Sequence, residues 1–468
     1  MTQTSTQPPA GDALERVMGV RALTASAFNM TVGSGIFVLP AAVAAMIGGA
    51  APVAYLVCAV AMALVVLCFA EAGSRVSRTG GTYAYATAAF GPFAGALTGA
   101  LLYAGAGAIA SAAVMNVFVG TLTVLAPSVG TPVVRVTVMA LAYGGLALLN
   151  IRGSKPGVRA VEVFSLGKLI PLLGLVAFGV FAMNGENLVI PSLPPVGDIG
   201  RACVTLVFAF LGFENALSPS GEVKDPHRTV PRAVLLALAL VTVLYLTIQM
   251  VAAGVLGPQL SKETEAPLAA VAGVVFGSAG STFILFGALV STFGYLSGDA
   301  LTSPRALYAL SEDGVLPPWL SSVHPAFRTP WLAVITHAVL AFTLASTGSF
   351  ATLIVVANVA ILLMYGVVCV GLLQLRRKNV RAGGDPFVVP GGPLVPVAAA
   401  GVLLWLLSTA TRAEWLATGI TLLLASVLYG MSLFMRRRAT PAGGERRSII
   451  RISRTSTASR KGRQRRSS

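Results

Sequence analysis

Three ionisable residues, Lys168, Glu214 and Asp299, lie in long apolar stretches of the 468-residue sequence. An ionisable group at membrane depth is costly and is a functional candidate by default. A buried Lys whose charged form is disfavoured can carry a proton. The alternative for Lys168 is that its long side chain snorkels to the interface, since it lies about 10 Å into its segment at 1.5 Å per residue.

The two carboxylates also have alternative interpretations. Glu214, two residues past Gly212, is either a network or proton-linked carboxylate near a binding site, or a group that pairs helices. Asp299 forms an ion pair with Lys168, or receives the basic side chain of a substrate, or lies in solvent if its segment ends earlier. The sequence leaves these alternatives open.

Two apolar segments are interrupted near their middle by glycine. The first, 22–47, contains Gly33, Ser34 and Gly35, and the sixth, 202–220, contains Gly212. Glycine gives the backbone the freedom to leave the helix, and irregular backbone at membrane depth is tolerated only where it is buried in protein or lines a cavity. Two breaks in corresponding segments therefore predict a transporter's binding site.

The chemistry of a helix break suits a molecule with two opposite charges. The half-helix that begins at the break offers N–H groups to a carboxylate, and the half-helix that ends there offers carbonyls to an ammonium. We expect the N–H groups of Gly33 to Gly35 and the Ser34 hydroxyl to bind a carboxylate, and the carbonyl near Thr31 to accept from an amine. The alternative is that these small residues serve close helix packing.

The second break and the third segment complete the predicted site. Leu211 and Gly212 open the backbone, and Phe208 covers the bound molecule or stacks on a cationic side chain, unless it is an ordinary core residue. Ser111 lines a side-chain pocket or joins helices by a hydrogen bond.

Among other polar residues, we expect Glu71 to pair with Arg75 four residues later. His337 is predicted to be a packing residue, and the groups predicted to form gating ion pairs in one loop are Glu222, Lys224, Asp225 and Arg228.

The elements that position these residues are apolar helices. Hydrophobic residues make up 55% of the chain and charged residues 11%, and many stretches reach the length of about 20 residues that crosses a membrane. The sequence predicts an all-α polytopic membrane protein. Its twelve predicted segments are 22–47, 51–70, 92–118, 133–150, 161–183, 202–220, 233–256, 272–298, 331–348, 352–375, 393–410 and 415–435.

The basic residues orient these segments. Most of the 33 Lys and Arg follow even-numbered segments or lie near the ends of the chain, so both termini are predicted to be cytoplasmic, in the plasma membrane. The tail 436–468 is basic and poor in apolar residues, which predicts a disordered, solvated segment that either stays free or contacts anionic lipids. No folded reading module accompanies this charge, so nucleic-acid binding is not expected.

Motifs of soluble enzymes are missing from the sequence. Its three histidines form no HExxH pattern, and no GxxxxGK[ST] phosphate loop occurs. The four cysteines lie in apolar segments without CxxC spacing, which indicates neither a disulfide framework nor a metal site. We expect no enzymatic activity, no cofactor and no metal.

Four stretches resemble one transporter family. They are GSGIF (33–37), RVSRTGGTYAY (75–85) running on to Phe90-Gly91-Pro92, GEVKDPHRTVP (221–231), and RALYALSEDGVLP (305–317) with His324-Pro325. Their order and spacing are similar to those of the amino acid–polyamine–organocation superfamily. The resemblance implies an inverted repeat of five plus five helices (the LeuT-like fold), in which helices 1 and 6 are discontinuous and two helices lie outside. The implied parts are 1–20, 21–185, 200–376, 393–435 and 436–468.

The resemblance also implies a function. It is secondary transport of amino acids or related amines by alternating access, as a proton symporter or an exchanger, in a monomer or homodimer. Phe208 resembles the family's aromatic gate, and the stretch around Lys168 resembles fifth helices in which a Lys ammonium replaces sodium. The alternatives are a non-transporting sensor or scaffold on the same fold and, within transport, a cationic amino acid or polyamine antiporter; the apolar Phe208 and Leu211 favour a neutral substrate.

Overall fold

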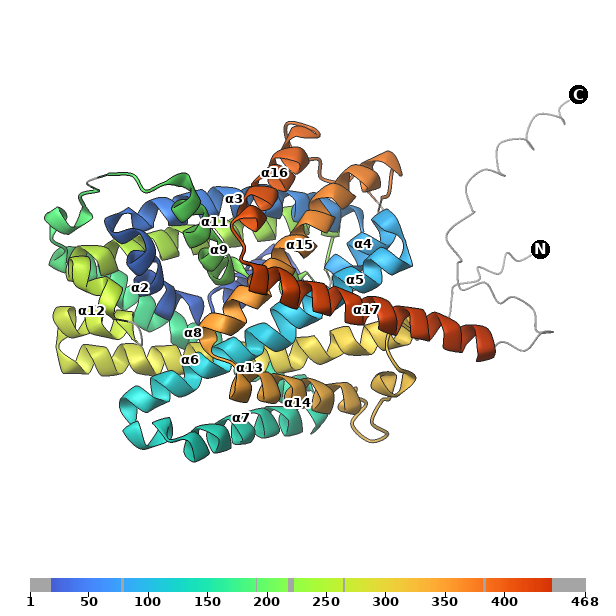
Figure 1. Ribbon diagram of the computed structural model, residues 1–468, viewed down its shortest axis with the longest axis horizontal. Helices are drawn as coiled ribbons and strands as arrows, with labels where there is room; N and C mark the ends of the chain where they lie inside the picture. The colour runs from blue at the N-terminus through green and yellow to red at the C-terminus, as the bar shows by residue number, and fades with distance from the viewer. Residues whose placement is uncertain are drawn as a thin grey trace, which may run out of the picture.

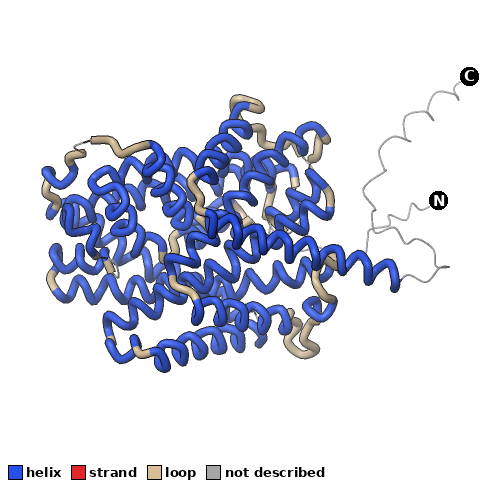
Figure 2. Tube along the Cα trace, viewed as in Figure 1, coloured by secondary structure: helices blue, strands red, loops and turns tan. Residues whose placement is uncertain are grey.

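The computed structural model describes residues 18–76, 80–152, 154–190, 192–217, 223–263, 266–381 and 384–439. Within these ranges the chain forms helices and turns without a β-strand (Figure 2). One isolated bridge joins Met18 to Val223. Most of the predicted basic tail, residues 440–468, and most of the predicted N-terminal segment lie outside the described residues, as does Glu222, whereas residues 436–439 are helical.

The helices follow the apolar segments of the sequence, and most of the long ones run roughly side by side (Figure 1). Their bounds are α1 Val20–Thr31, α2 Gly35–Ile47, α3 Ala51–Arg75, α4 Thr82–Phe90, α5 Pro92–Leu102, α6 Ala110–Leu125, α7 Pro132–Arg152, α8 Ser154–Gly179, α9 Val196–Phe210, α10 Phe213–Ala216, α11 Pro226–Leu256, α12 Pro267–Phe276, α13 Ser278–Glu312, α14 Trp331–Thr347, α15 Phe350–Arg377, α16 Leu394–Ser408 and α17 Arg412–Ala439. A π-helical stretch, Tyr103–Ile109, joins α5 to α6.

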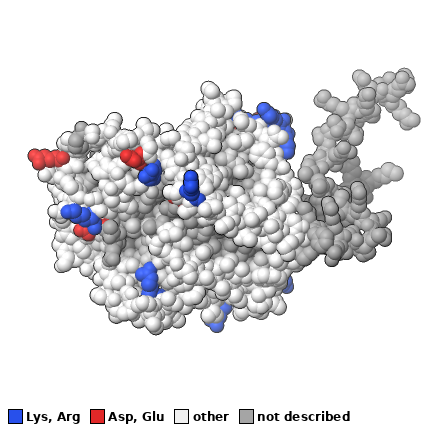
Figure 3. Space-filling model, in the orientation of Figure 1, with Lys and Arg blue, Asp and Glu red and all other residues white. Residues whose placement is uncertain are grey.

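Many of these helices are long and apolar enough to cross a membrane. Over the described residues eight spans meet that description, and four shorter helices are also apolar: Gly167–Ala182, Pro267–Phe276, Trp331–Thr347 and Leu394–Ser408. Large apolar side chains such as Leu141 and Phe181 are exposed, and most of the face seen in Figure 3 is uncharged. The fold is therefore that of an all-α membrane protein, while the count of twelve spans and the inverted repeat remain predictions.

The boundaries predicted for the eighth segment, 272–298, are wrong at both ends. The chain ends α12 at Phe276 and turns at Gly277, whose φ is +72°, before α13 begins. At the other end α13 continues for 14 residues beyond the predicted end, through Pro304 to Glu312. Proline and charged residues usually mark a helix end, but here the helix continues, so Asp299 lies well inside it.

Several helices enclose the centre of the molecule. α1 packs against α11 and α10, α2 packs against α9, and α8 lies along α13. Aromatic side chains such as Phe69, Phe210, Tyr245 and Tyr365 are fully buried between them. The two interrupted helices are thus held from several sides, which fixes the irregular backbone at each break.

Candidate functional site

The two predicted breaks exist, and they touch each other. α1 ends at Thr31 and α2 begins at Gly35, while α9 ends at Phe210 and α10 begins at Phe213. Gly212 has a φ of +114°, and a Cβ added to it would lie 2.3 Å from the carbonyl oxygen of Met30 in α1. Only glycine fits such a backbone at such a close approach.

Lys168 occupies the carbonyl end of α1. Its Nζ donates to the carbonyl oxygens of Asn29, at 2.6 Å, and Val32, at 2.5 Å. The side chain comes from α8 and is 2% exposed. The ammonium therefore lies on the first break and does not extend to the membrane interface. A cation at a helix C-terminus is favourable because the last carbonyls lack intrahelical partners.

Thr31 does not fit its predicted role. Its carbonyl oxygen accepts from the Tyr245 hydroxyl at 2.9 Å and from the Gly33 N–H at 2.8 Å. A carbonyl has two lone pairs, so this oxygen is already satisfied and is not free for a substrate amine. The Gly33 N–H is used as well, which removes one of the three predicted carboxylate donors.

The N-terminal end of α2 is the free end of the first break. Among the described residues, the N–H groups of Ser34 and Gly35 have no backbone acceptor. The Ser34 hydroxyl is buried without a partner in the same part of the chain. Gly35 has a packing role too, because a Cβ on it would lie 3.1 Å from the Cα of Ala209 in α9. Gly35 therefore serves close helix packing, while its N–H group has no backbone acceptor in the described chain.

The second break has the opposite arrangement. Glu214 Oε2 accepts from the Gly212 N–H and from the Tyr365 hydroxyl, both at 3.0 Å, so this carboxylate occupies the N-terminal end of α10. Its Oε1 has no partner among the described residues. The aromatic rings of Phe69, Phe213 and Tyr365 form a cluster beside it, with centroids 5.2 to 5.7 Å apart.

The carbonyl end of α9 is left without a capping hydrogen bond within the described chain. Leu211, which follows it, is extended, with φ −69° and ψ 156°. Phe208, on the last turn of α9, is 7% exposed and packs edge-on against Phe350 at 5.7 Å between ring centroids. The last carbonyls of α9 thus remain available to a cation.

Asp299 does not pair with Lys168, and this expectation is corrected. Its Oδ2 lies 3.0 Å from His337 Nε2, and the Ser303 hydroxyl donates to its Oδ1. Asp299 is 1% exposed, so the alternative of a solvated residue is also wrong. His337 in turn lies with its Nδ1 3.4 Å from the hydroxyl of Tyr103, at the start of the π-helical stretch.

The contact between His337 and Asp299 was not predicted from the sequence. Sequence spacing cannot show that α13 and α14 bring residues 38 positions apart into contact. A signal was nevertheless present, since a histidine and a carboxylate in apolar segments both need a polar partner at membrane depth. Ser111 is likewise engaged, because its Oγ lies 3.3 Å from the Tyr143 hydroxyl.

A buried ion cluster lies where α3 ends. Glu71 pairs with Arg75 at 2.7 Å, which confirms the predicted contact, and also with Arg376 of α15 at 2.5 Å. The same carboxylate accepts from the Val389 N–H at 2.9 Å. In contrast, the predicted gating ion pairs are not formed within the described chain, where Lys224, Asp225 and Arg228 make no salt bridge. Nor do the described residues include a group of three His, Cys, Asp or Glu that could hold a metal ion.

Most of the chain matches the model of a known protein family. The model of the family described as amino acid permease matches residues 18–434. The chain belongs to the amino acid permease family. This membership confirms the resemblance to the wider amino acid–polyamine–organocation superfamily, and together with the apolar helices it makes this permease a multi-pass membrane protein of a transporter family.

Several curated relatives align over most of this permease. The serine/threonine exchanger SteT of Bacillus subtilis is 28% identical over 433 residues, covering 89% of this chain and 97% of the relative. The methylthioribose transporter of the same organism is 28% identical, covering 87% and 93%. Its branched-chain amino acid permease BcaP is 26% identical over 414 residues, covering 82% and 85%.

Proposed function

We propose that this permease transports neutral α-amino acids across the plasma membrane by alternating access. The observation that carries the proposal is the pattern of free ends at the two breaks. The protein's own ammonium fills the carbonyl end of α1 and its own carboxylate fills the N–H end of α10. The N–H end of α2 and the carbonyl end of α9 are left for a substrate.

These free ends define the orientation of the substrate. Its carboxylate binds the N–H groups of Ser34 and Gly35 and the Ser34 hydroxyl, which has no partner among the described residues. Its ammonium binds the last carbonyls of α9, under Phe208 and Leu211. Helix ends favour these charges electrostatically. Both groups sit on one carbon in an α-amino acid, which suits two breaks in direct contact.

The charges already present favour a neutral side chain. Lys168 and Glu214 bring one formal charge of each sign, and Asp299 is engaged by His337 and Ser303. A polyamine has no carboxylate for the α2 end, so the cationic alternative has less support. Two relatives are named for neutral amino acids, a serine/threonine exchanger and a branched-chain amino acid permease.

We propose that the buried ionisable groups couple transport to the movement of a proton. Lys168 holds the place of a metal cation on the α1 carbonyls, which removes the need for sodium, and it carries the coupled proton if the mode is symport. Glu214, with one carboxylate oxygen unpartnered, and Asp299 are the further proton-linked groups. One relative is named as an exchanger, which supports exchange as the mode. The distribution of basic residues supports the proposal that both termini are cytoplasmic.

The test begins with thermal shifts of the purified protein. The panel contains neutral amino acids, arginine, lysine, putrescine and methylthioribose, and we expect stabilisation by neutral amino acids alone. Uptake of labelled serine or leucine into proteoliposomes, with and without internal amino acid and a pH gradient, then separates exchange from symport. A protein that binds these ligands but moves none of them is a sensor, and one stabilised only by putrescine or arginine contradicts the proposed substrate class.

A further inference from the structure

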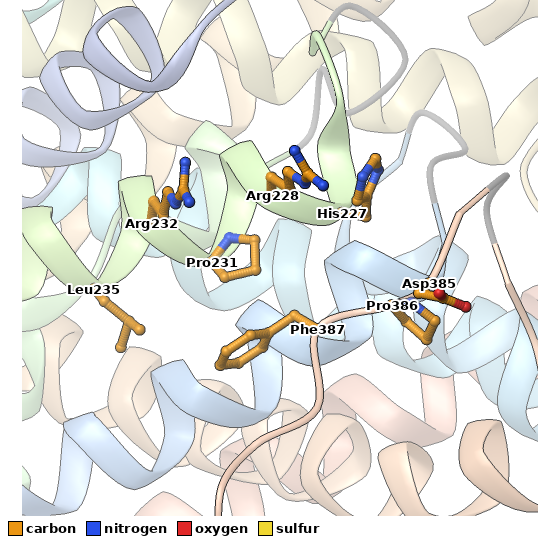
Figure 4. Close-up of a pocket in the computed structure, with 8 residues that line it drawn as sticks. All are labelled: His227, Arg228, Pro231, Arg232, Leu235, Asp385, Pro386 and Phe387. Atoms are coloured by element: carbon orange, nitrogen blue, oxygen red, sulfur yellow. The ribbon is translucent and has the colours of Figure 1, made fainter.

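A basic groove lies away from the two breaks, between the start of α11 and the chain segment before α16. Its volume is about 430 Å³. One wall is α11, and the other is the segment 385–387 (Figure 4). This segment is attached to the core, since the Phe387 carbonyl accepts from the Ser74 hydroxyl at 3.4 Å. The residues that line the groove are His227, Arg228, Pro231, Arg232, Leu235, Asp385, Pro386 and Phe387.

The described residues do not neutralise the charge of this groove. Arg228 and Arg232 are exposed and form no salt bridge with a described residue. Among the described residues that line the groove the one carboxylate is that of Asp385, which is itself paired with Arg381 at 3.2 Å. The nearby arginines of the buried cluster differ, because Arg75 and Arg376 share the carboxylate of Glu71. Two guanidinium groups one helical turn apart therefore have no anionic partner among the described residues.

The same face of α11 continues into a row of exposed apolar side chains. Four residues beyond Arg232 comes Leu236, followed by Leu240 and Val243, which are 49%, 47% and 66% exposed. At 100° per residue these side chains and the two arginines fall within about 120° of the helix surface. The two arginines are thus followed on the same helix face by an apolar track, which consists of Leu236, Leu240 and Val243.

We propose that this groove binds an anionic glycerophospholipid. The phosphate lies between Arg228 and Arg232, whose planar guanidinium groups suit phosphate oxygens. The glycerol region rests on Pro231 and Phe387, and an acyl chain follows Leu236 and Leu240. Basic pockets between transmembrane helices bind anionic head groups in this way. The apolar track distinguishes a lipid from a free phosphate, which would gain nothing from it.

The experiment compares two double variants of the full-length protein. Arg228→Gln with Arg232→Gln removes the site, and Arg152→Gln with Arg377→Gln removes the same charge from exposed arginines elsewhere. Each protein is titrated in detergent with dioleoyl phosphatidylglycerol, with dioleoyl phosphatidylcholine and with glycerol 3-phosphate. Melting temperature and the number of lipids retained in native mass spectrometry are measured, and size-exclusion profiles check folding.

We expect phosphatidylglycerol to stabilise the unmodified protein and the control pair. In the Arg228/Arg232 variant half-saturation should need about 25-fold more lipid, at about fivefold per arginine, and one lipid fewer should be retained. Equal retention in both variants would place the bound lipid elsewhere and overturn the proposal. So would equal stabilisation by phosphatidylcholine, or stabilisation by glycerol 3-phosphate at the same site, which would indicate a soluble anion.

Discussion

The two helix breaks look equivalent in the sequence and differ in the structure. At the first break the carbonyl end is occupied by Lys168, and no described residue engages the N–H end. At the second break the N–H end is occupied by Glu214, and no described residue caps the carbonyl end. Within the described chain each break therefore carries one internal charge and one free end, and the two free ends are of opposite polarity.

Under the proposed function, this difference would allow one site to recognise a zwitterion. If both breaks offered all four ends, a dication or a dianion would also find partners. With Lys168 and Glu214 in place, the proposed substrate completes the set with one carboxylate and one ammonium. In this proposal the internal charges contribute to selectivity as well as to structure.

The largest effect is expected from Gly212→Ala. A Cβ there would meet the Met30 carbonyl at 2.3 Å with φ at +114°, and strain plus overpacking should cost at least about 3 kcal/mol. Uptake into proteoliposomes should fall to background and the melting temperature should drop. Gly33→Ala is the matched control from the other break, because its Cβ would meet Tyr295 only at 3.6 Å. Equal damage by both variants would contradict the proposed difference between the glycines.

Lys168→Ala should have the next largest effect. It leaves the carbonyls of Asn29 and Val32 without a charged donor, and hydrogen bonds to charged groups contribute about 1.5–3 kcal/mol each. We expect initial uptake to fall about 100-fold and any dependence on the pH gradient to disappear. Lys262→Ala, at an exposed lysine, serves as the control. An unaltered proton dependence in Lys168→Ala would exclude this residue from coupling.

Ser34→Ala tests the free end of the first break. The hydroxyl has no partner in the described chain, so its removal should leave the melting temperature unchanged. Loss of one hydrogen bond to the substrate carboxylate should raise the KM for a neutral amino acid about tenfold. Ser111→Ala is the comparison, since that hydroxyl faces Tyr143. An unchanged KM in Ser34→Ala would mean that the carboxylate binds elsewhere.

The smallest effect on selectivity is expected from Asp299→Asn. Because His337 and Ser303 already engage this carboxylate, competition by serine, arginine and putrescine should change by less than about twofold. The melting temperature should fall, because the buried hydrogen bond between His337 and the Asp299 carboxylate is weakened. A large change in competition by arginine would show that Asp299 faces the substrate.

Much of the fold could be predicted from the sequence, because the length of an apolar stretch and the position of a glycine determine helices and helix breaks locally. The breaks at Gly33 and Gly212 and the Glu71–Arg75 contact depend on residues close together in the chain. The partners of Lys168 and Asp299 depend on which helices become neighbours. Their contacts join residues that are far apart in the sequence, on α8 and α1 and on α13 and α14. The end of the eighth segment was predicted too early, because Pro304 and Asp299 are residue types that usually mark a helix end, although α13 contains both.

The free ends themselves could not be predicted, since they depend on hydrogen bonds already made by the protein. The Thr31 carbonyl illustrates this point: its sequence position suggests a binding group, but Tyr245 and Gly33 satisfy it. Glu214 is the converse case, because nothing in the sequence shows that its carboxylate turns back to the Gly212 N–H.

The central claim is most directly tested by calorimetric titration with four ligands of similar size: L-alanine, L-alaninamide, propionate and ethylamine. We predict measurable binding of L-alanine alone, because both charges are required to engage the two free helix ends, and about tenfold weaker binding of L-alanine to Ser34→Ala. Binding of ethylamine or alaninamide as tightly as L-alanine would contradict it.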